Sequence, residues 1–236
     1  MYELKKITAI IPARGGSKGL PNKNLRNMVG KPLIAWSIEQ AKLCNLIDTI
    51  IVSTENDEIA FVARQYGAEI PFKRPASLAD DTVNVMDVLI HALAELSSKL
   101  TLTDLVVLLQ PTSPLRVADD ISNAIHIFSE REAHAVVSVC EVDHSPIWAN
   151  TLPADLCMKN FIRPEALNRN RQDFEVYYRI NGAIYLAEIG FLLDNKNFYD
   201  EKTFAYVMPR ERSVDVDSLV DFEYAEYLLG KSLIHV

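Results

Sequence analysis

The sequence predicts an α/β fold, a doubly wound and mostly parallel sheet. Short apolar stretches with the length and branching of buried strands, such as 7–11 and 104–109, alternate with stretches that carry apolar residues at helical spacing. Turns rich in glycine, proline and polar residues follow the strands, as is typical of the ligand-binding edge of such a sheet. With 236 residues, 49% of them hydrophobic, the chain can form one domain with a modest insertion.

Each element has its own local signals. Pro32 suits the first position of a helix, and Asn56 or Asp57 can cap the next one. Asp81 or Thr82 can cap a third helix. We expect strands at 7–11, 47–54, 104–109, 135–142 and 181–186, and helices at 32–43, about 57–66, 83–98, 117–131 and 219–229.

The region from about 143 to 178 interrupts this alternation. Helical periodicity is lost, polar and aromatic residues mix, and a basic cluster lies at 168–172. We interpret this region as an insertion that leaves the main sheet, within a single domain that spans 1–236.

A glycine-rich loop follows the first strand. Pro12 ends that strand, and three cations then stand among three glycines: Arg14, Lys18 and Lys23 among Gly15, Gly16 and Gly19. Glycines let backbone N–H groups approach a ligand closely, and several cations beside free amides suit a polyanion. The loop therefore predicts a triphosphate site rather than a solvated turn.

Two familiar phosphate-binding motifs do not fit this loop. The dinucleotide fingerprint requires a glycine where Arg14 stands, and the P-loop requires Gly-Lys-Ser/Thr where Lys18-Gly19-Leu20 stands. The broken fingerprint argues against an NAD-dependent oxidoreductase.

Further polar residues stand where neighbouring strands and helices end. Arg74 lies in the irregular stretch 72–82, whose acidic residues can cap a helix or face the ligand. Gln110 follows the strand 104–109, where an amide can recognise a sugar or a base. In an extended strand, Asp215 and Asp217 would lie on one face, and their mutual repulsion would be relieved by Mg²⁺. Alternatively, Asp217 or Ser218 caps the last helix.

The composition excludes some classes of partner. A net charge of −8 argues against binding to nucleic acid or to an anionic membrane surface. Cys44, Cys140 and Cys157 have no metal-binding spacing and cannot all pair, which indicates a reducing compartment. Residues 1–6 lack the apolar core of a signal peptide, and no apolar run is long enough for a bilayer. We expect a cytoplasmic protein.

Five motifs together resemble the CMP-sialic acid synthetases (acylneuraminate cytidylyltransferases), including the legionaminic and pseudaminic acid cytidylyltransferases. They are A-R-G-G-S-K-G-L-P-N-K-N at 13–24, R-P-x-x-L-A-x-D-T at 74–82, Q-P-T-S-P-L-R at 110–116, R-x-N-G-A-I-Y at 179–185 and D-x-D at 215–217. Their order and spacing extend the resemblance over essentially the whole chain.

The resemblance implies a nucleotide-diphospho-sugar transferase-like, Rossmann-like fold that moves CMP from CTP to the anomeric hydroxyl of a nine-carbon 2-keto acid sugar, releasing pyrophosphate. It implies a homodimer whose insertion makes the contact and lends Arg171 and Gln172 to the neighbouring site; an arginine fork suits the sugar's carboxylate. The implied nucleotide-binding residues are Arg14, Gly15, Gly16, Ser17, Lys18, Lys23, Asn24 and Arg74; the sugar-binding residues are Gln110, Arg171, Asn181, Tyr185, Phe198 and Tyr199; Asp215 and Asp217 bind Mg²⁺; and Arg14, Lys23, Asp215 and Asp217 are catalytic.

Some alternatives stay open. Composition alone favours ordinary packing for Phe198 and Tyr199. No lysine stands near Trp148, where some sialic acid enzymes have one, which leaves the sugar open among N-acetylneuraminic, legionaminic and pseudaminic acids. A sugar nucleotidyltransferase that uses GTP or UTP is the main other class. A non-catalytic nucleotide sensor is disfavoured because binding alone needs no paired carboxylates.

Overall fold

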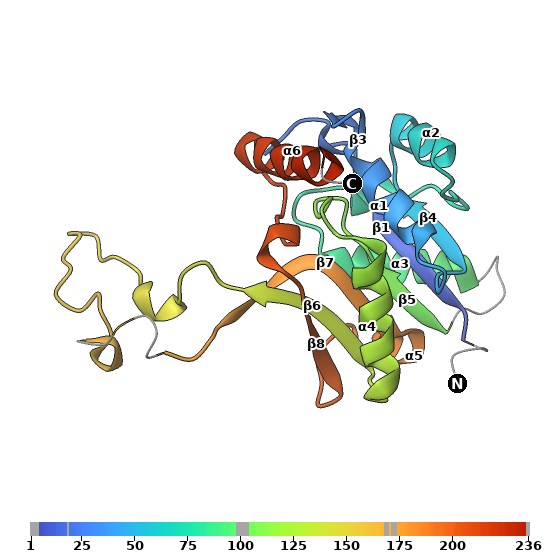
Figure 1. Ribbon diagram of the computed structural model, residues 1–236. Helices are drawn as coiled ribbons and strands as arrows, with labels where there is room; N and C mark the ends of the chain where they lie inside the picture. The colour runs from blue at the N-terminus through green and yellow to red at the C-terminus, as the bar shows by residue number, and fades with distance from the viewer. Residues whose placement is uncertain (1–4, 18, 98–103, 168–169, 171–173, 235–236) are drawn as a thin grey trace.

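A six-stranded sheet with the order β4-β1-β5-β7-β6-β8 forms the centre of the protein. The computed structural model describes residues 5–17, 19–97, 104–167, 170 and 174–234. β7 is antiparallel to both neighbours, and the other five strands of this sheet share one direction (Figure 1). The strands are β1 (Ile7–Pro12), β4 (Thr49–Ser53), β5 (Leu105–Leu108), β6 (Ala135–Glu141), β7 (Tyr178–Glu188) and β8 (Thr203–Val207). The predicted mostly parallel sheet is confirmed.

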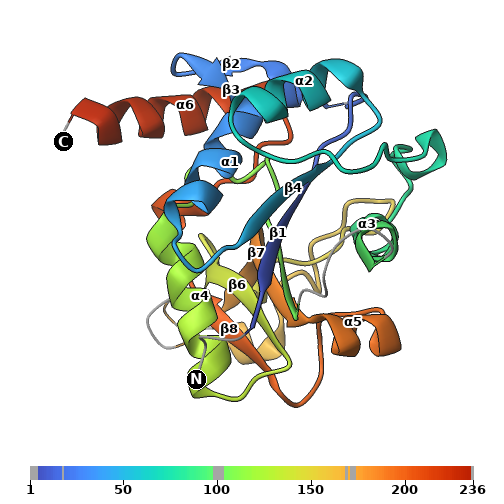
Figure 2. The same ribbon diagram turned by 90° about the vertical axis from the view of Figure 1, so that its right-hand side faces the viewer.

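Helices cover both faces of the sheet, as a doubly wound fold requires (Figure 2). Alternation along β1 explains the two cores, because Ala9 and Ile11 pack in one apolar cluster and Ile10 packs in the other. The first cluster includes side chains of α1 (Leu33–Leu43), α2 (Asp57–Gln65) and α4 (Ala118–Glu130); the second includes side chains of α3 (Val85–Ser97) and α5 (Ile189–Asn195).

The C-terminal helix belongs to a third apolar cluster. α6 (Leu219–Ile234) contributes Phe222 and Ala225, which join Leu20 and Met28 beside the glycine-rich loop. Met28 lies in a small hairpin formed by β2 (Asn27–Met28) and β3 (Lys31–Pro32). This cluster holds the loop and the start of α6 together.

The sheet gathers the predicted motifs at one edge. β1, β4 and β5 are parallel, so the residues after their carboxyl ends meet there. β7 runs the opposite way, which brings its first residues to the same edge: Arg179 is paired with Cys140, near the end of β6.

Several helix boundaries differ from the predicted ones. α3 begins at Val85, and the Asn84 side chain accepts a hydrogen bond from the Met86 N–H (2.9 Å), so the predicted caps Asp81 and Thr82 are wrong. Pro32 precedes α1 instead of opening it. The predicted cap Asn56 is confirmed by its bonds from Glu58 and Ile59 of α2.

Asp215 and Asp217 lie in no strand, which corrects the predicted strand there. The alternation of the side chains is nevertheless present, because Val216 is buried in the third cluster while both carboxylates lie outside it. A backbone bond from the Val216 N–H to the Thr112 carbonyl (2.8 Å) holds this extended segment against the loop that follows β5.

Between β6 and β7, the described parts of residues 142–177 form an arm that extends away from the sheet (Figure 1). Its described parts contain two single turns, η3 (Pro146–Trp148) and η4 (Pro164–Ala166). Exposed apolar side chains lie along the arm, namely Leu152, Leu156, Met158, Leu167, Val176 and Tyr177.

Candidate active site

A cleft of about 250 Å³ lies at the edge where β1 and β5 end. The glycine-rich loop, the segment 74–88, the segment after β5 and the Asp215–Asp217 segment all contribute to its wall. Its lining residues are Pro12, Arg14, Ser17, Lys23, Asn24, Arg74, Leu78, Asp80, Asp81, Val83, Val85, Val88, Gln110, Pro111, Thr112 and Asp217.

Two cations of the glycine-rich loop face acidic partners across this cleft. Arg14 forms an ion pair with Asp81 (2.6 Å). Lys23 donates to the Val216 carbonyl (2.6 Å) and lies 3.0 Å from the Asp217 carboxylate. Both cations thus stand beside carboxylates, and a bound polyanion could take the place of these carboxylates as their partner.

Asn24 stabilises the glycine-rich loop through a hydrogen bond to its backbone. It is buried, and its amide donates to the Arg14 carbonyl (3.0 Å). This bond fixes the backbone on which Arg14 stands, so the structure places Asn24 both at the cleft wall and in the support of the loop.

Glu55, which the sequence analysis missed, closes the other side of the loop. One carboxylate oxygen accepts the Gly15 N–H (2.7 Å), and the other accepts from Arg74 at Nε (3.2 Å) and Nη2 (2.5 Å). The Gly15 N–H was expected to face the triphosphate, but it already donates its hydrogen bond to Glu55. A carboxylate directly after the strand at 47–54 was the available signal.

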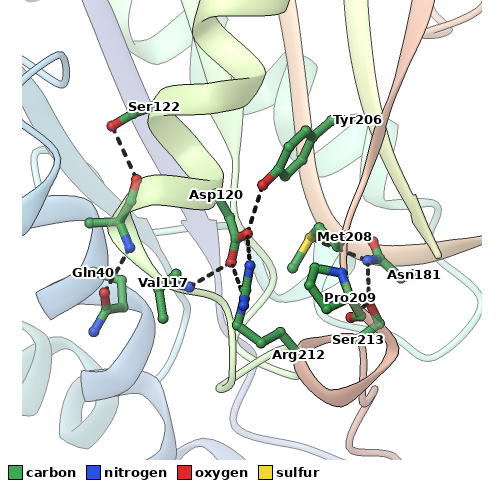
Figure 3. Close-up of polar contacts among 11 residues, drawn as sticks. Gln40, Val117, Asp120, Ser122, Asn181, Tyr206, Met208, Pro209, Arg212 and Ser213 are labelled. Atoms are coloured by element: carbon green, nitrogen blue, oxygen red, sulfur yellow. Dashed lines mark hydrogen bonds and ion pairs between the residues drawn. The ribbon is translucent and has the colours of Figure 1, made fainter. Parts of the chain in front are cut away.

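A polar network fixes Arg212 and Ser213, the residues just before the Asp215–Asp217 segment (Figure 3). Arg212 makes two hydrogen bonds to the fully buried Asp120 (3.0 and 2.8 Å), and the Tyr206 hydroxyl donates to the same carboxylate (2.8 Å). Ser213 accepts from the Asn181 amide (2.9 Å). The two carboxylates near the cleft thus depend on a rigid scaffold.

Asp215 and Asp217 have different surroundings. Partial burial raises the pKa of Asp215, and the nearby charge of Asp217 raises it further. A hydrogen bond with Thr112 and the charges of Lys23 and Arg179 act in the opposite direction but do not cancel the rise. The Asp217 side chain is exposed. It does not cap α6, because Ser218 and Asp221 bond reciprocally there.

Gly19 allows the loop to approach this segment. A Cβ atom at Gly19 would lie 2.4 Å from the Asp217 carbonyl oxygen, closer than any real contact. A glycine is therefore required where the loop meets the carboxylate segment.

The predicted sugar side is partly assembled. A Cβ atom at Gly182 would lie 3.6 Å from the Gln110 amide nitrogen and 3.8 Å from an Asp215 oxygen, so these two side chains face the same point. Burial, with the charges of Tyr199 and Asp215, raises the pKa of Tyr185 to about 12, so its phenol stays protonated at neutral pH.

The other predicted sugar residues have mixed surroundings. Phe198 is buried and packs on Tyr185 (ring centres 5.0 Å apart), while Tyr199 is exposed. Asn181 is 1% exposed, and its amide is bonded to Ser213 and Met208 within the protein. A direct sugar contact by Asn181 would require those bonds to break.

Arg116, the last residue of Q-P-T-S-P-L-R, lies inside the protein. It donates to the Ala183 carbonyl (2.6 Å) and to the Ser37 hydroxyl (2.7 Å). Burial lowers its pKa to about 10, which leaves it charged at neutral pH. It joins the end of β5 to β7 and does not face the cleft.

Three predicted residues, Lys18, Arg171 and Gln172, lie outside the described residues. Within the described part, no group of three or more metal-ligating side chains occurs. The pair Asp215 and Asp217 still fits Mg²⁺, which takes one or two carboxylates together with substrate phosphates. No described helix has the length and apolar character needed to cross a bilayer.

The profile of the family described as "Cytidylyltransferase" matches residues 8–225. The chain is 38% identical over 231 residues to the CMP-N,N'-diacetyllegionaminic acid synthase of Legionella pneumophila, covering 95% of this chain and 96% of that protein. It is 32% identical over 223 residues to the pseudaminic acid cytidylyltransferase of Campylobacter jejuni (94% and 96% covered). It is 36% identical over 220 residues to the N-acylneuraminate cytidylyltransferase of Escherichia coli, covering 93% of this chain and 51% of that protein.

Solved structures confirm the fold. A structure of CMP:2-keto-3-deoxy-manno-octonic acid synthetase complexed with CTP superposes with a TM-score of 0.73 at 16% identity, covering 97% of this chain and 100% of that chain. The 4-diphosphocytidyl-2C-methyl-D-erythritol synthase from Anaerococcus prevotii gives a TM-score of 0.66 at 14% identity, with 96% and 99% covered.

Proposed function

We propose the reaction of this chain from one premise: the chain belongs to the cytidylyltransferase family. It transfers CMP from CTP to the anomeric hydroxyl of a nonulosonic acid and releases pyrophosphate. The named relatives support the sugar class, since they act in CMP-legionaminic, CMP-pseudaminic and CMP-sialic acid synthesis. N-acetylneuraminic, legionaminic and pseudaminic acids are the candidate acceptors.

The contact between Lys23 and the Asp217 segment is the observation that supports this reaction most strongly. It brings a loop cation, a carboxylate pair and the end of β5 to one cleft. An attack by a sugar hydroxyl on the α-phosphorus needs positioning and charge neutralisation more than covalent help from the protein.

In the proposed mechanism, Arg14 and Lys23 bind the triphosphate, with Lys18 and the amides of Gly16 and Ser17. Asn24 and Arg74 shape the wall around the nucleoside. These groups hold the α-phosphate in a fixed position and offset its developing charge.

Asp215 and Asp217 would hold Mg²⁺, which supplies charge neutralisation at the phosphates and lowers the pKa of a nearby hydroxyl. A cation held there would also offset the burial and the charge of Asp217, which together raise the pKa of Asp215. No histidine lines the described cleft, so we assign no protein general base.

On the sugar side, Gln110 and the protonated Tyr185 donate hydrogen bonds to the acceptor, and Tyr199 lies at its outer edge. Arg171 and Gln172 reach the site from the neighbouring subunit of a cytoplasmic homodimer. The exposed apolar side chains of the arm support such a contact, because soluble proteins rarely leave large apolar patches uncovered.

The experiment measures pyrophosphate release from the purified protein with CTP and Mg²⁺. The three acids are offered in parallel, and GTP and UTP replace CTP in controls. We expect release only with CTP and at least one acid. Release with GTP or UTP and a hexose phosphate, and none with any acid, would refute the proposal. Light scattering during gel filtration tests the dimer separately.

A further inference from the structure

Glu55 is an acidic residue bonded to Arg74 in the wall of a cleft that we expect to bind a polyanion. It follows β4 at the carboxyl edge of the sheet, and two further bonds tie its neighbours to the site. The Ala13 N–H donates to the Ser53 carbonyl, and the Arg74 N–H donates to the Thr54 carbonyl, both at 3.0 Å. The end of β4 is thus the backbone frame of the nucleotide pocket.

The carboxylate of Glu55 serves as the counterion of Arg74. The Arg74 side chain is 3% exposed and that of Glu55 is 19% exposed. Burial alone would raise the pKa of Glu55, but the hydrogen bonds from Arg74 and from the Gly15 N–H outweigh it and hold that pKa below its ordinary value. The pair is therefore charged at neutral pH, and loss of the countercharge would leave a buried guanidinium uncompensated, which is strongly unfavourable.

The same carboxylate also sets the direction of the loop backbone. Its bond to the Gly15 N–H points that amide at Glu55, two residues after the end of β4, and neither Gly15 nor Glu55 lines the described cleft. A Cβ atom at Gly15 would lie 2.6 Å from the Asn56 side chain, so the loop is pressed against the start of α2 as well. Arg14 and Ser17, on either side, line the cleft.

We propose that Glu55 is a positioning residue for the nucleotide: it orients Arg74 at the cleft wall and fixes the glycine-rich loop through Gly15. This inference deepens the proposed function and rests on it. Glu55 acts through these two groups. Because its carboxylate neutralises the charge of Arg74, the cations assigned to the triphosphate are Arg14, Lys18 and Lys23.

Glu55→Gln tests the proposal because it keeps the shape of the side chain and removes its charge. We expect the KM for CTP and the dissociation constant of CTP, measured by calorimetry without sugar, to rise about tenfold, a size typical of one lost charged hydrogen bond. The turnover number and the KM for the sugar should change less than threefold. Asp57→Asn is the matched control. This exposed acid forms its ion pair with the exposed Lys73, outside the cleft wall, so the variant should bind CTP as the wild type does.

A double-variant cycle with Arg74→Met distinguishes positioning from a general loss of structure. If Glu55 acts through Arg74, the two changes together should weaken CTP binding much less than the product of their separate effects. A product of the two effects, or an unchanged CTP affinity in a folded Glu55→Gln protein, would overturn the inference. If the wild type uses GTP or UTP instead of CTP, the proposed function is wrong, and the same cycle with that nucleotide decides the role of Glu55.

Discussion

Arg212 is the residue whose loss we expect to disturb the carboxylate segment most. Removing it leaves the fully buried Asp120 with two donors, the Val117 N–H and the Tyr206 hydroxyl. Breaking a buried ion pair from one side costs about 3–5 kcal/mol. Because the Arg212 side chain is 36% exposed and Asp120 keeps two donors, we expect Arg212→Ala to lower the free energy of unfolding by about 2–3 kcal/mol.

Thermal and urea unfolding measure this loss. For a chain of this size the melting temperature should fall by about 4–12 °C. The control is Arg210→Ala, two residues before Arg212. It removes the exposed ion pair between Arg210 and Asp143 and should change the free energy of unfolding by less than about 0.5 kcal/mol. Equal, small losses for Arg212→Ala and Arg210→Ala would show that the network behind the segment does not hold it.

Three further changes test other contacts of the site. Gly19→Ala should lower the free energy of unfolding by about 1–3 kcal/mol, because its methyl group would collide with the Asp217 backbone. Gly16→Ala should not lower it, because a methyl group there meets no atom within 4 Å. Urea titration of the two variants measures the difference. Lys23→Ala should lower kcat about 100-fold and leave the sugar KM within threefold, and near-normal turnover would refute its role. The advantage in unfolding free energy of the wild type over Glu55→Gln should be present above pH 4.5 and vanish as pH falls through the lowered pKa of Glu55; an advantage that is independent of pH would contradict the charge argument.

The parallel half of the sheet follows from local pattern. The apolar runs at 7–11 and 105–109 are buried on both faces, and such strands need helices on either side. The glycine-rich loop could also be placed, since it directly follows a strand at the carboxyl edge. β8 and α5 were not predicted, because their half-exposed, short sequences carry weak periodicity.

The supporting contacts of the site could not be predicted in the same way. Asp120 and Arg212 are 92 residues apart in the sequence, and Glu55 and Arg74 are 19 apart. Nothing local distinguishes Asp120, which lies in the first turn of α4, from an ordinary capping residue. Asn181 belongs to a motif, but only the fold reveals that its amide is bonded internally.

The central claim is transfer of CMP to a sugar, and the fate of the α-phosphate tests it most directly. The protein would be incubated with Mg²⁺, a nonulosonic acid and CTP that carries a label on the α-phosphorus, and the products would be separated and weighed by mass spectrometry. We predict that the label enters a CMP–sugar phosphodiester, formed in equal amount with pyrophosphate. Label found only in free CMP under conditions in which the CMP–sugar is stable, or left in CTP with every acid, would contradict the account.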